Sequence, residues 1–402
     1  MALMPVADAY AAVLKNADAL AEESVALNDA FHRTLARDVA ALRTQPPAAM
    51  SAMDGYAVRA ADAVLGARLT VIGEVAAGRP FDRNIGAGQA ARIFTGGVVP
   101  GGADAVVIQE DATRDGDIVI VNEAITQGKN IRPAGIDFKE GDVLLPRGSL
   151  LSDRALALAA GMNHPRLTVH RRPKVAILAT GDELVAPGET LAPGQIVYSN
   201  VFALAALARS EGAEVIDLGV ARDTMESTSG GIRRARDLGA DILLTTGGAS
   251  VGDHDLVQAA LKAEGVDMAF WKIALRPGKP MMNGRLGAMR VLGLPGNPVS
   301  SYICAFLFLV PLIRALSGRA QVDHVFERAV LGRDLPANDQ RQDYLRARLA
   351  TGGDGVPVAT SVGAQDSSLV ANLAAADALI IRPPHAAAAP AGSPCSILRL
   401  PG

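Results

Sequence analysis

The sequence predicts an α/β multidomain protein built around a doubly wound, mostly parallel sheet. Three observations support this fold class. The chain has 402 residues, more than one ordinary hydrophobic core can organise. Short apolar runs alternate with helical patterns over 172–318, as expected when helices connect parallel strands. Glycine-rich segments with short apolar stretches flank this region at 46–141 and 319–402, and they indicate two β-rich units.

The region before the sheet is expected to contain a discontinuous helical domain, formed by 1–45 and 142–171. The first segment starts with a helical pattern, and the second contains another at 151–162, which Ser152 can cap. We expect these two helices to pack beside each other. The intervening segment, 46–141, is then a β-rich insert in the helical domain.

Two dipeptides between apolar stretches indicate β-hairpins, because aspartate or asparagine before glycine favours tight turns with positive φ. Asp115-Gly116 lies inside the insert, and Asn283-Gly284 precedes the apolar run 291–294. The last segment, 319–402, lacks a helical period, so we expect it to form a small β-barrel or sandwich.

The alternating region 172–318 is expected to be the α/β domain. Its predicted strands are 175–179, 215–220, 241–244, a segment near Ala269, and 291–294. Its predicted helices are 199–210, 224–238 with Asp223 or Thr224 as its cap, 256–262, and a long apolar helix that Asn297-Pro298 opens. The apolar run 302–313 is too short to span a bilayer, so we expect a buried helix.

Composition favours small-molecule partners over nucleic acid or a membrane. The formal net charge of −3 provides no basic field for a polyanion. The N-terminus has no basic stretch followed by an apolar core, so we expect no signal peptide. The cysteines, Cys304 and Cys395, lie far apart, which fits a reducing compartment without a zinc or disulfide framework. We therefore expect a cytoplasmic protein.

Three loops rich in turn residues follow predicted strands of the sheet. They are Thr180–Glu183, Gly247–Asp255 and Pro295–Pro298. In a doubly wound sheet, ligands bind beyond the carboxyl ends of the strands. Glycines let backbone N–H groups approach an anion, and Asp253 and Asp255 are suitable ligands for a divalent cation. Each loop alone could be an ordinary connection, but together they predict a site for an anionic ligand and a metal.

A cationic cluster is expected beside these loops. Lys272 and Arg276 are four residues apart on an apolar segment, so on one strand they would share a face, and Pro277-Gly278 would keep Lys279 nearby. Such a cluster suits a multiply charged ligand, although a solvated strand end is the alternative. His254 has no metal-type spacing, and the sequence contains no pattern that argues for a Ser-His-Asp or Cys-His catalytic group.

Seven motifs, in this order, resemble those of the MoeA family of molybdopterin molybdenumtransferases, which is also represented by the E domain of gephyrin. The motifs are SAMDGYA at 51–57, TGGVVPGGADAVV at 95–107, NIRPAGIDFKEG at 130–141, ATGDEL at 179–184, TTGGASVGDHD at 245–255, WKIALRPGKP at 271–280 and LPGNPVS at 294–300. Together they cover essentially the whole chain. Residue 276 departs from the family, where many relatives have lysine, and Ala249 replaces a commoner valine.

The resemblance implies a fold and an activity. The fold is an elongated homodimer, in which 172–318 is the molybdopterin-binding α/β domain and 319–402 is a C-terminal β-barrel. The implied activity is the Mg²⁺-dependent insertion of molybdate into adenylylated molybdopterin (adenylyl-molybdopterin), with release of AMP. Contact with the molybdopterin adenylyltransferase and with molybdoenzyme maturation factors is a further expectation.

Motif matching assigns the expected site residues. Catalytic roles are implied for Asp54, Asp137, Glu183, Asp223, Asp255, Lys272 and Arg276. Asp255 and Asp223 are expected to hold Mg²⁺, and Lys272 and Arg276 match basic positions associated with molybdate and phosphate. Substrate-binding roles are implied for Thr95, Arg132, Thr180, Gly181, Gly247, Gly248, Ser250, Gly252, Lys279, Pro295, Gly296, Asn297, Pro298, Arg341 and Ser367.

The insert and the α/β domain both carry expected catalytic residues, so we expect each active site to be shared between two subunits. Two other functions stay open. One is a different enzyme on the same α/β domain, an adenylyltransferase or a nucleotide-pyrophosphate hydrolase. The other is a scaffold that binds the pterin without turnover, as in the gephyrin branch.

Overall fold

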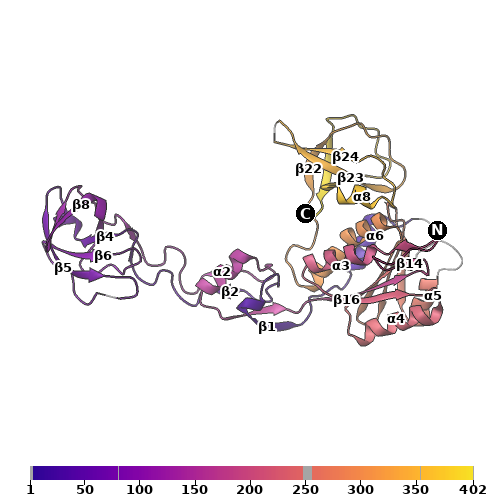
Figure 1. Cartoon of the computed structure of the whole chain (residues 1–402), viewed down its shortest axis with the longest axis horizontal. Coiled ribbons are helices and arrows are strands. Elements are labelled where there is room, and N and C mark those ends of the chain that lie inside the picture. Colours follow the sequence, from indigo (N-terminus) through magenta and orange to yellow (C-terminus); the bar gives the residue numbers. More distant parts are fainter. Residues whose placement is uncertain (1–2, 80, 248–255, 354, 402) are drawn as a thin grey trace.

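The computed structural model describes residues 3–79, 81–247, 256–353 and 355–401. The chain is elongated, with the β-rich insert at one end, a small unit in the middle, and the α/β domain beside the C-terminal barrel at the other end (Figure 1). The predicted fold class is confirmed, because a mostly parallel sheet covered by helices is combined with a β-rich insert and a β-barrel.

A six-stranded sheet in the order β16-β13-β17-β21-β20-β18 forms the centre of the α/β domain. Its strands are β13 (Lys174–Thr180), β16 (Glu214–Ala221), β17 (Ile242–Thr246), β18 (Asp267–Lys272), β20 (Pro280–Leu286) and β21 (Met289–Leu294). β16, β13, β17 and β21 are parallel, whereas β20 and β18 each pair antiparallel with the preceding strand. A two-stranded pair, β14 (Leu184–Val185) with β15 (Ile196–Val197), follows β13.

Helices cover both faces of this sheet. They are α3 (Asn200–Ser210), α4 (Met225–Asp237), α5 (Leu256–Ala263), α6 (Pro298–Cys304), the π-helical segment η4 (Ala305–Leu309) and α7 (Val310–Leu316). On β13, Val175 and Ile177 face the core formed with α3, α6 and α7, while Ala176 and Leu178 face the core formed with α4 and α5. This alternation explains why the central strands are apolar on both faces.

The long apolar helix is buried, as predicted. α6, η4 and α7 form a segment of 19 residues, Pro298–Leu316, which by length and composition could cross a membrane. However, 83% of its most apolar window is buried inside the chain, as is typical of a core helix. It begins at Pro298, where the missing N–H of proline costs no helical hydrogen bond.

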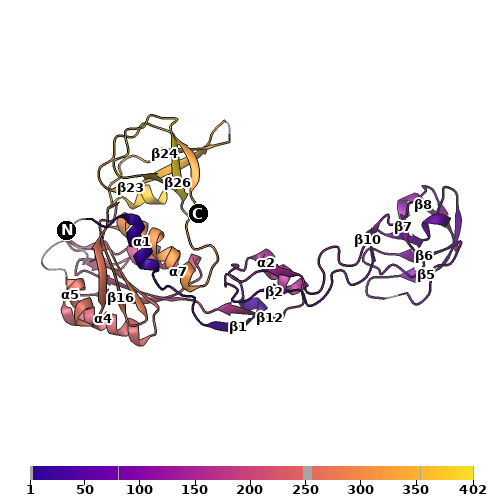
Figure 2. The same cartoon turned by 180° about the vertical axis from the view of Figure 1, so that it is seen from behind.

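The N-terminal helix α1 (Val6–Leu14) packs on the α/β domain. Ala9 and Val13 are buried in the same core as α7, and α1 lies beside α7 in Figure 2. The predicted packing of this helix beside 151–162 is therefore wrong. The physical reason is that α1 presents a narrow apolar stripe, and the strongly apolar α7 provides the surface that buries it.

The middle unit is made by two separate segments of the chain. The strand pair β1 (Glu22–Ala26) with β12 (Arg166–His170) joins them, as does β2 (Val39–Ala40) with β11 (Val143–Leu145). Helix α2 (Asp153–Gly161) covers these strands, and the Ser152 side chain accepts a hydrogen bond from the Ala155 N–H, as expected of a cap. The domain boundaries stay predictions, namely 1–45 with 142–171, 46–141, 172–318 and 319–402.

The insert contains a six-stranded sheet in the order β7-β4-β6-β5-β9-β8. Its strands are β4 (Gly55–Val58), β5 (Arg68–Val75), β6 (Gln89–Ile93), β7 (Ala105–Ile108), β8 (Ala112–Asp115) and β9 (Ile118–Val121), with a separate pair formed by β3 (Met50–Ser51) and β10 (Ile131–Arg132). The hairpin predicted at Asp115-Gly116 is confirmed, because Asp115 pairs with Ile118 and Gly116 has a φ of +58°.

The C-terminal segment forms a closed barrel. Its strands are β22 (Glu327–Leu331), β23 (Gln342–Thr351), β24 (Pro357–Ser361), β25 (Ala378–Arg382) and β26 (Pro394–Arg399), with a short helix α8 (Val370–Ala374) before β25. The ring β23-β24-β22-β26-β25 closes through the pairing of β23 with β25. A short strand from the α/β region, β19 (Leu275–Arg276), adds to β23 and joins the two domains.

The hairpin predicted at Asn283-Gly284 is wrong. Both residues lie inside β20, and the turn to β21 occurs at Gly287, where φ is +60°. A Cβ atom on Gly284 would lie 2.7 Å from Val266 Cγ1 and 2.8 Å from the Asp267 carbonyl oxygen. Close packing against β18, not a turn, therefore explains this glycine.

Gly284→Ala should destabilise the protein by about 1–3 kcal/mol, because the added methyl group overpacks the contact with β18. The matched control is Gly230→Ala in α4, where a Cβ meets nothing within 4 Å. Since alanine is more favourable than glycine inside a helix, the free energy of unfolding of the control should rise by about 0.5–1 kcal/mol. Denaturant unfolding measures both changes, and equal stability of the two variants would contradict this packing argument.

Candidate functional site

Three strand ends meet at the carboxyl edge of the α/β sheet. β13, β17 and β21 are parallel neighbours, and Thr246 at the end of β17 pairs with Ala179 on one side and with Leu294 on the other. The three loops singled out in the sequence begin directly after these positions. They are therefore adjacent in space, which is the arrangement expected of a ligand site in a doubly wound sheet.

Gly247 shows how closely the loops approach one another. Its φ is +93°, and a Cβ atom at this position would collide with the carbonyl oxygen of Thr180. The Thr180 hydroxyl donates a hydrogen bond to the Thr246 carbonyl at 3.3 Å. A Cβ atom on Gly296 would lie 3.5 Å from Gly247 Cα. Only glycine fits at 247, and its backbone is left close to both neighbouring loops.

The connections after β13 and β17 leave the sheet on opposite faces. β13 leads to α3, which packs in one core, whereas β17 leads to α5, which packs in the other. Adjacent strands whose connections diverge in this way leave a crevice between them at the carboxyl edge. The predicted loops therefore border the switch point of the sheet.

Two exposed aspartates, Asp182 and Asp223, lie together at this edge. They follow β13 and β16, which are parallel neighbours. The Asp182 N–H donates to Asp223 Oδ2 at 3.4 Å, and the Asp223 N–H donates to Asp182 Oδ1 at 3.2 Å. Sequence reasoning gave roles to Asp223 and to exposed Glu183, which is next to Asp182 in the chain, but none to Asp182. Asp182 can be recognised from the strand order, which brings it beside Asp223, but local sequence patterns do not provide that order.

The loop at the end of β21 is held from two sides. The Asn200 side chain on α3 donates to the Gly296 carbonyl at 2.7 Å. The Asn297 side chain donates to Ser367 Oγ at 2.9 Å, and the Val299 N–H donates to the Ser367 carbonyl at 3.0 Å. The predicted residues Gly296, Asn297 and Ser367 are thus brought together, although Ser367 belongs to the barrel.

The predicted shared face of Lys272 and Arg276 is wrong. Lys272 ends β18 in the α/β sheet, whereas Arg276 lies on β19 beside the barrel. The chain bends at Ala274, so the alternation of one continuous strand does not apply. Lys279 does lie near Lys272, because its carbonyl accepts from the Ile273 N–H at 3.0 Å. Since β18 runs parallel to β21, Lys272 reaches the same edge as the glycine loops.

Arg276 is held by side chains of the C-terminal segment. It donates to both carboxylate oxygens of Asp343, to Asn338 Oδ1 at 2.9 Å and to Asp339 Oδ2 at 3.2 Å. The bonds to Asp343 raise the pKa of Arg276, against the effect of burial. Arg341 donates to Asp339 at 3.0 Å, and its bonds, with the charge of Arg276, lower the pKa of Asp339 to about 2. Arg276 and Arg341 therefore lie in an ion-pair network between the two domains.

In the insert, Asp54 and Thr95 lie together. The N–H and the hydroxyl of Thr95 both donate to Asp54 Oδ1 at 2.8 Å. These bonds hold the pKa of the partly exposed Asp54 carboxyl below its usual value, with a smaller contribution from the charge of Arg92. Arg92 lies against the rings of Tyr56 and Phe94, 5.2 and 4.9 Å from their centroids. Sequence reasoning missed Arg92, because no local pattern places it beside Asp54.

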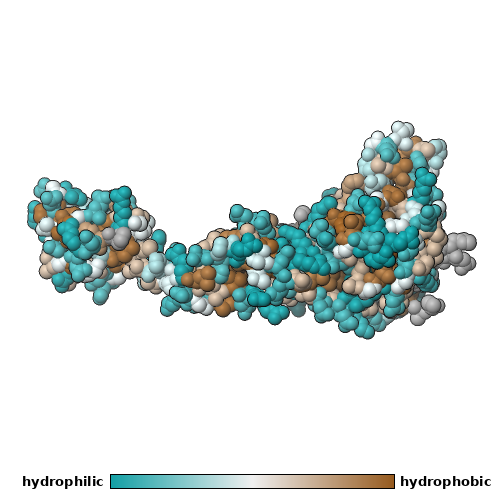
Figure 3. All heavy atoms as spheres, turned by 90° about the horizontal axis from the view of Figure 1, so that it is seen from below, coloured by the Kyte–Doolittle hydropathy of each residue, from teal (hydrophilic) through white to brown (hydrophobic). Residues whose placement is uncertain are grey.

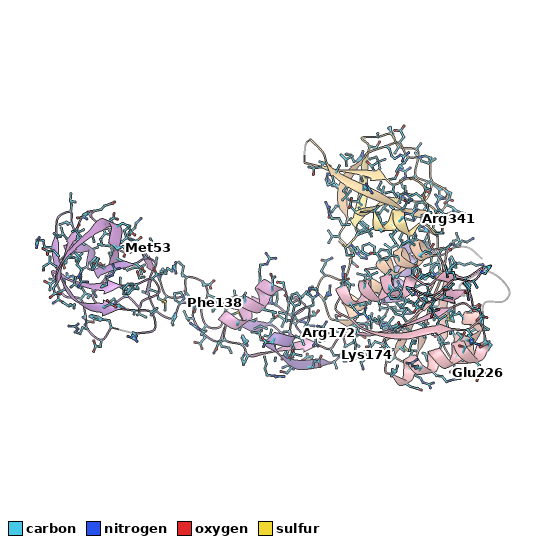
Figure 4. All side chains as sticks on the ribbon, viewed as in Figure 1. Met53, Phe138, Arg172, Lys174, Glu226 and Arg341 are labelled. Carbon is cyan, nitrogen blue, oxygen red and sulfur yellow. The ribbon has the colours of Figure 1, made fainter. Side chains whose placement is uncertain are left out.

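The remaining predicted residues of the arm, which we define as the middle unit and the insert together, lie apart from the α/β domain. Arg132 is exposed on β10 at the end of the insert, and the Asp137 N–H donates to the Gln45 carbonyl at 3.1 Å, next to the middle unit. Figure 4 labels Met53, Phe138 and Arg341 at three separate places along the molecule. Within one chain, the described site residues of the insert, the middle unit and the α/β domain therefore fall into groups that do not meet.

Several predicted residues lie outside the described part of the chain. They are Gly248, Ser250, Gly252 and Asp255, together with Asp253, His254 and Ala249. Within residues 3–79, 81–247, 256–353 and 355–401, no group of three or more histidine, cysteine, aspartate or glutamate side chains is placed to hold a metal ion. The described carboxylates thus offer at most a pair, such as Asp182 with Asp223.

Thr95→Val should raise the pKa of Asp54 towards its usual value, because one of the two bonds to Oδ1 is lost. The shift should be partial, since the N–H of residue 95 still donates. Carboxyl-carbon NMR titration measures it. Thr113→Val, at an exposed threonine elsewhere in the insert, should leave the Asp54 titration unchanged. If the pKa of Asp54 were the same in Thr95→Val as in the wild type, the Thr95 hydroxyl would make no contribution to that pKa.

Family models match three successive parts of the chain. The MoeA N-terminal region (domain I and II) matches residues 4–162, a probable molybdopterin binding domain matches 176–315, and the MoeA C-terminal region (domain IV) matches 328–400. A molybdopterin biosynthesis MoeA protein from Pyrococcus horikosii, known from its crystal structure, aligns with 100% of each chain at a TM-score of 0.83 and 30% identity.

Named relatives agree with these matches. The chain is 39% identical to the molybdopterin molybdenumtransferase of Haemophilus influenzae, over 74% of each chain. It is 36% identical to that of Nostoc sp., over 87% of this chain and 82% of the relative, and 35% identical to that of Bacillus subtilis, over 90% and 86%. The chain belongs to the MoeA family of molybdopterin molybdenumtransferases, and it is a transferase of molybdenum cofactor biosynthesis.

Proposed function

We propose that this transferase inserts molybdate into adenylylated molybdopterin in a Mg²⁺-dependent reaction that releases AMP. The observation that carries the proposal is the meeting of three loops at the carboxyl edge of the α/β sheet, with lysines and aspartates at the same edge. This substrate contains a pyrophosphate, and molybdate is a dianion. A site for both needs donors for phosphate oxygens, cations for the oxyanion and acids for a metal.

The backbone around Gly247 is suited to phosphate, because Gly247 has no side chain and lies close to the loops that begin at Thr180 and Pro295. Closely spaced N–H groups at strand-to-helix connections stabilise anions without a permanent charge. In the proposed complex this backbone holds the pterin phosphate. The enzyme then acts by positioning and by electrostatic stabilisation, without a covalent nucleophile.

The described carboxylates fit Mg²⁺ bound to substrate. Magnesium in phosphate sites is commonly held by one or two carboxylates together with phosphate oxygens and water. Asp182 and Asp223 are both exposed at the edge of the site, and each carboxylate has oxygen lone pairs beyond its single bond to a neighbouring N–H. Asp223, with Asp255 from the sequence motif, would hold the ion. Mg²⁺ bound there would neutralise charge on the pyrophosphate.

Lys272 and Lys279 supply positive charge at the same edge. Lys272 ends β18, and Lys279 is joined to the next residue of that segment by a backbone hydrogen bond. In the proposal, Lys272 collects molybdate beside the pterin. Arg276 is a weaker candidate for the oxyanion, because its guanidinium already binds Asp343 and Asn338.

AMP release should depend on both molybdate and Mg²⁺ when the purified protein is given adenylyl-molybdopterin. In Lys272→Ala the molybdate concentration for half-maximal AMP release should rise about tenfold or more, because a charge-assisted contact is lost. Pterin binding, measured separately, should change little. Lys262→Ala, at an exposed lysine on α5, is the matched control.

Other outcomes of this assay identify the alternatives. AMP release without molybdate would indicate a nucleotide-pyrophosphate hydrolase, and pterin binding without AMP release would indicate a scaffold. An unchanged molybdate dependence in Lys272→Ala would refute the role given to that lysine. Insensitivity to chelation of Mg²⁺ would refute the metal requirement.

A homodimer with shared sites is part of the proposal. Asp54 and Thr95 belong to the insert, which lies at the end of the molecule far from the α/β domain, so they need a second chain to approach an α/β domain. The middle unit exposes apolar side chains that such a partner could cover, and Figure 3 shows apolar surface on this central part. These residues are Phe31, Leu42, Val143, Leu144 and Leu150.

Mixing Asp54→Ala and Asp223→Ala subunits should restore activity if sites are shared. In a random mixture half the dimers are hybrids, and each hybrid has one intact site and one site with both defects. Recovery should therefore approach about a quarter of wild type. If each site were built within one chain, every hybrid site would carry a defect and the mixture would stay inactive. Differently tagged chains establish that subunits exchanged.

A cytoplasmic location fits this chemistry, since molybdate and nucleotide are small soluble reactants. The molybdopterin adenylyltransferase is the expected supplier of the substrate. Molybdoenzyme maturation factors are the expected recipients of the product. These partners rest on the family resemblance.

A further inference from the structure

The C-terminal barrel reaches the α/β site through residues 362–368, which we call the capping loop. Within it, the Ser367 carbonyl accepts from the Val299 N–H at 3.0 Å, and Ser367 Oγ accepts from the Asn297 side chain at 2.9 Å. Asn297 and Val299 belong to the start of α6, directly after the strand end that borders the site. A loop of one domain thus contacts a candidate substrate-binding loop of another.

These bonds replace the usual cap of a helix. The first N–H groups of a helix have no acceptor in the helix itself, and an asparagine before the helix commonly supplies one from its side chain. In α6 the Asn297 side chain makes no such cap, Pro298 has no N–H, and the Val299 N–H is satisfied by Ser367. The start of α6 therefore depends on the barrel for its hydrogen bonding.

Arg346 holds the capping loop in place. Its side chain is 1% exposed, and its guanidinium donates to the carbonyls of Asp366 at 2.9 Å and of Ala364 at 3.4 Å. The Gln365 side chain bonds back to both the N–H and the carbonyl of Arg346, at 3.0 and 3.1 Å. A buried arginine is costly to desolvate, so its bonds to backbone carbonyls favour one conformation of this loop.

We propose that Arg346 and Ser367 are positioning residues of the transferase, which fix the Pro295–Pro298 loop from the barrel side. Asn200 fixes the same loop from the opposite side, through the Gly296 carbonyl. Ser367 then acts through Asn297 and Val299 and does not need to touch the substrate. The inference rests on the proposed function, because it takes this loop to contact the pterin substrate.

Amide hydrogen exchange at Val299 in the full-length protein, without substrate, tests the capping bond directly. Arg346→Lys keeps the charge but loses the fork that binds two carbonyls, so exchange at Val299 should accelerate about fivefold or more. The KM for adenylyl-molybdopterin should rise more than kcat falls. The matched control is Arg348→Lys, at an exposed arginine on the same strand, which should change neither quantity.

Ser367→Ala provides a second variant, because a partly exposed serine can be replaced without loss of the barrel. It loses the bond from Asn297 but keeps the backbone carbonyl. Exchange at Val299 should therefore accelerate, and the KM should rise, by less than in Arg346→Lys. Wild-type exchange at Val299 in folded Ser367→Ala and Arg346→Lys would overturn the proposal. If Arg346→Lys does not fold, Ser367→Ala decides alone. A raised KM with unchanged Val299 exchange would instead assign Ser367 to direct substrate contact.

The exchange measurement does not depend on the reaction. If AMP release proved independent of molybdate while Val299 lost protection in both variants, the proposed function would fail and the capping role would stand. If Val299 kept its protection in both variants while AMP release depended on molybdate, the proposed function would stand and the capping role would fail.

Discussion

The register of three parallel strands is the constraint on which the α/β site depends. β13, β17 and β21 end level with one another, so the loops that follow them start side by side. A slip of one residue would move a strand end by about 3.3 Å and turn its side chains to the opposite face of the sheet. In this register Gly247 lies against the Thr180 carbonyl, which leaves no room for a side chain at 247. A slip that brought any other residue to this place would therefore cause a collision.

Local patterns in the sequence were sufficient for most of the α/β domain. Asp223 or Thr224 was expected to cap the following helix, and it is the Thr224 side chain that accepts from the Ser227 N–H at 3.2 Å. Pro298 was expected at the first turn of the long apolar helix, where it lies. The loops after 175–179, 241–244 and 291–294 were expected at one edge, because parallel strands joined by helices place their carboxyl ends together. These inferences needed only periodicity, caps and connection rules.

The predictions that failed depended on contacts between distant parts of the chain. Arg276 was placed on the face of Lys272 by counting along one strand, but the chain bends and β19 joins the barrel through β23. Gly284 was interpreted as a turn residue, whereas its role is set by Val266 and Asp267, at the start of the neighbouring strand. The capping of α6 by Ser367 could not be predicted, since Asn297 is by itself a good cap.

The joint between the arm and the α/β domain gives the long arm a defined direction. Arg171 binds the Asp241 carboxylate with two bonds of 2.7 Å, and Arg172 bridges the domains by donating to the Phe31 carbonyl at 3.2 Å and to the Gly212 carbonyl at 2.9 Å. Figure 4 labels Arg172 at this joint.

Burial lowers the pKa of Arg172, so the charged side chain is held there at some cost in desolvation. An arginine at this place offers several donors in one plane, which fixes the angle between the arm and the α/β domain better than apolar packing alone. The insert that carries Asp54 and Thr95 lies at the far end of the arm, where even a small rotation at the joint is amplified. If the insert of one subunit completes the site of another, the accuracy of that site is determined at Arg171 and Arg172, far from any substrate.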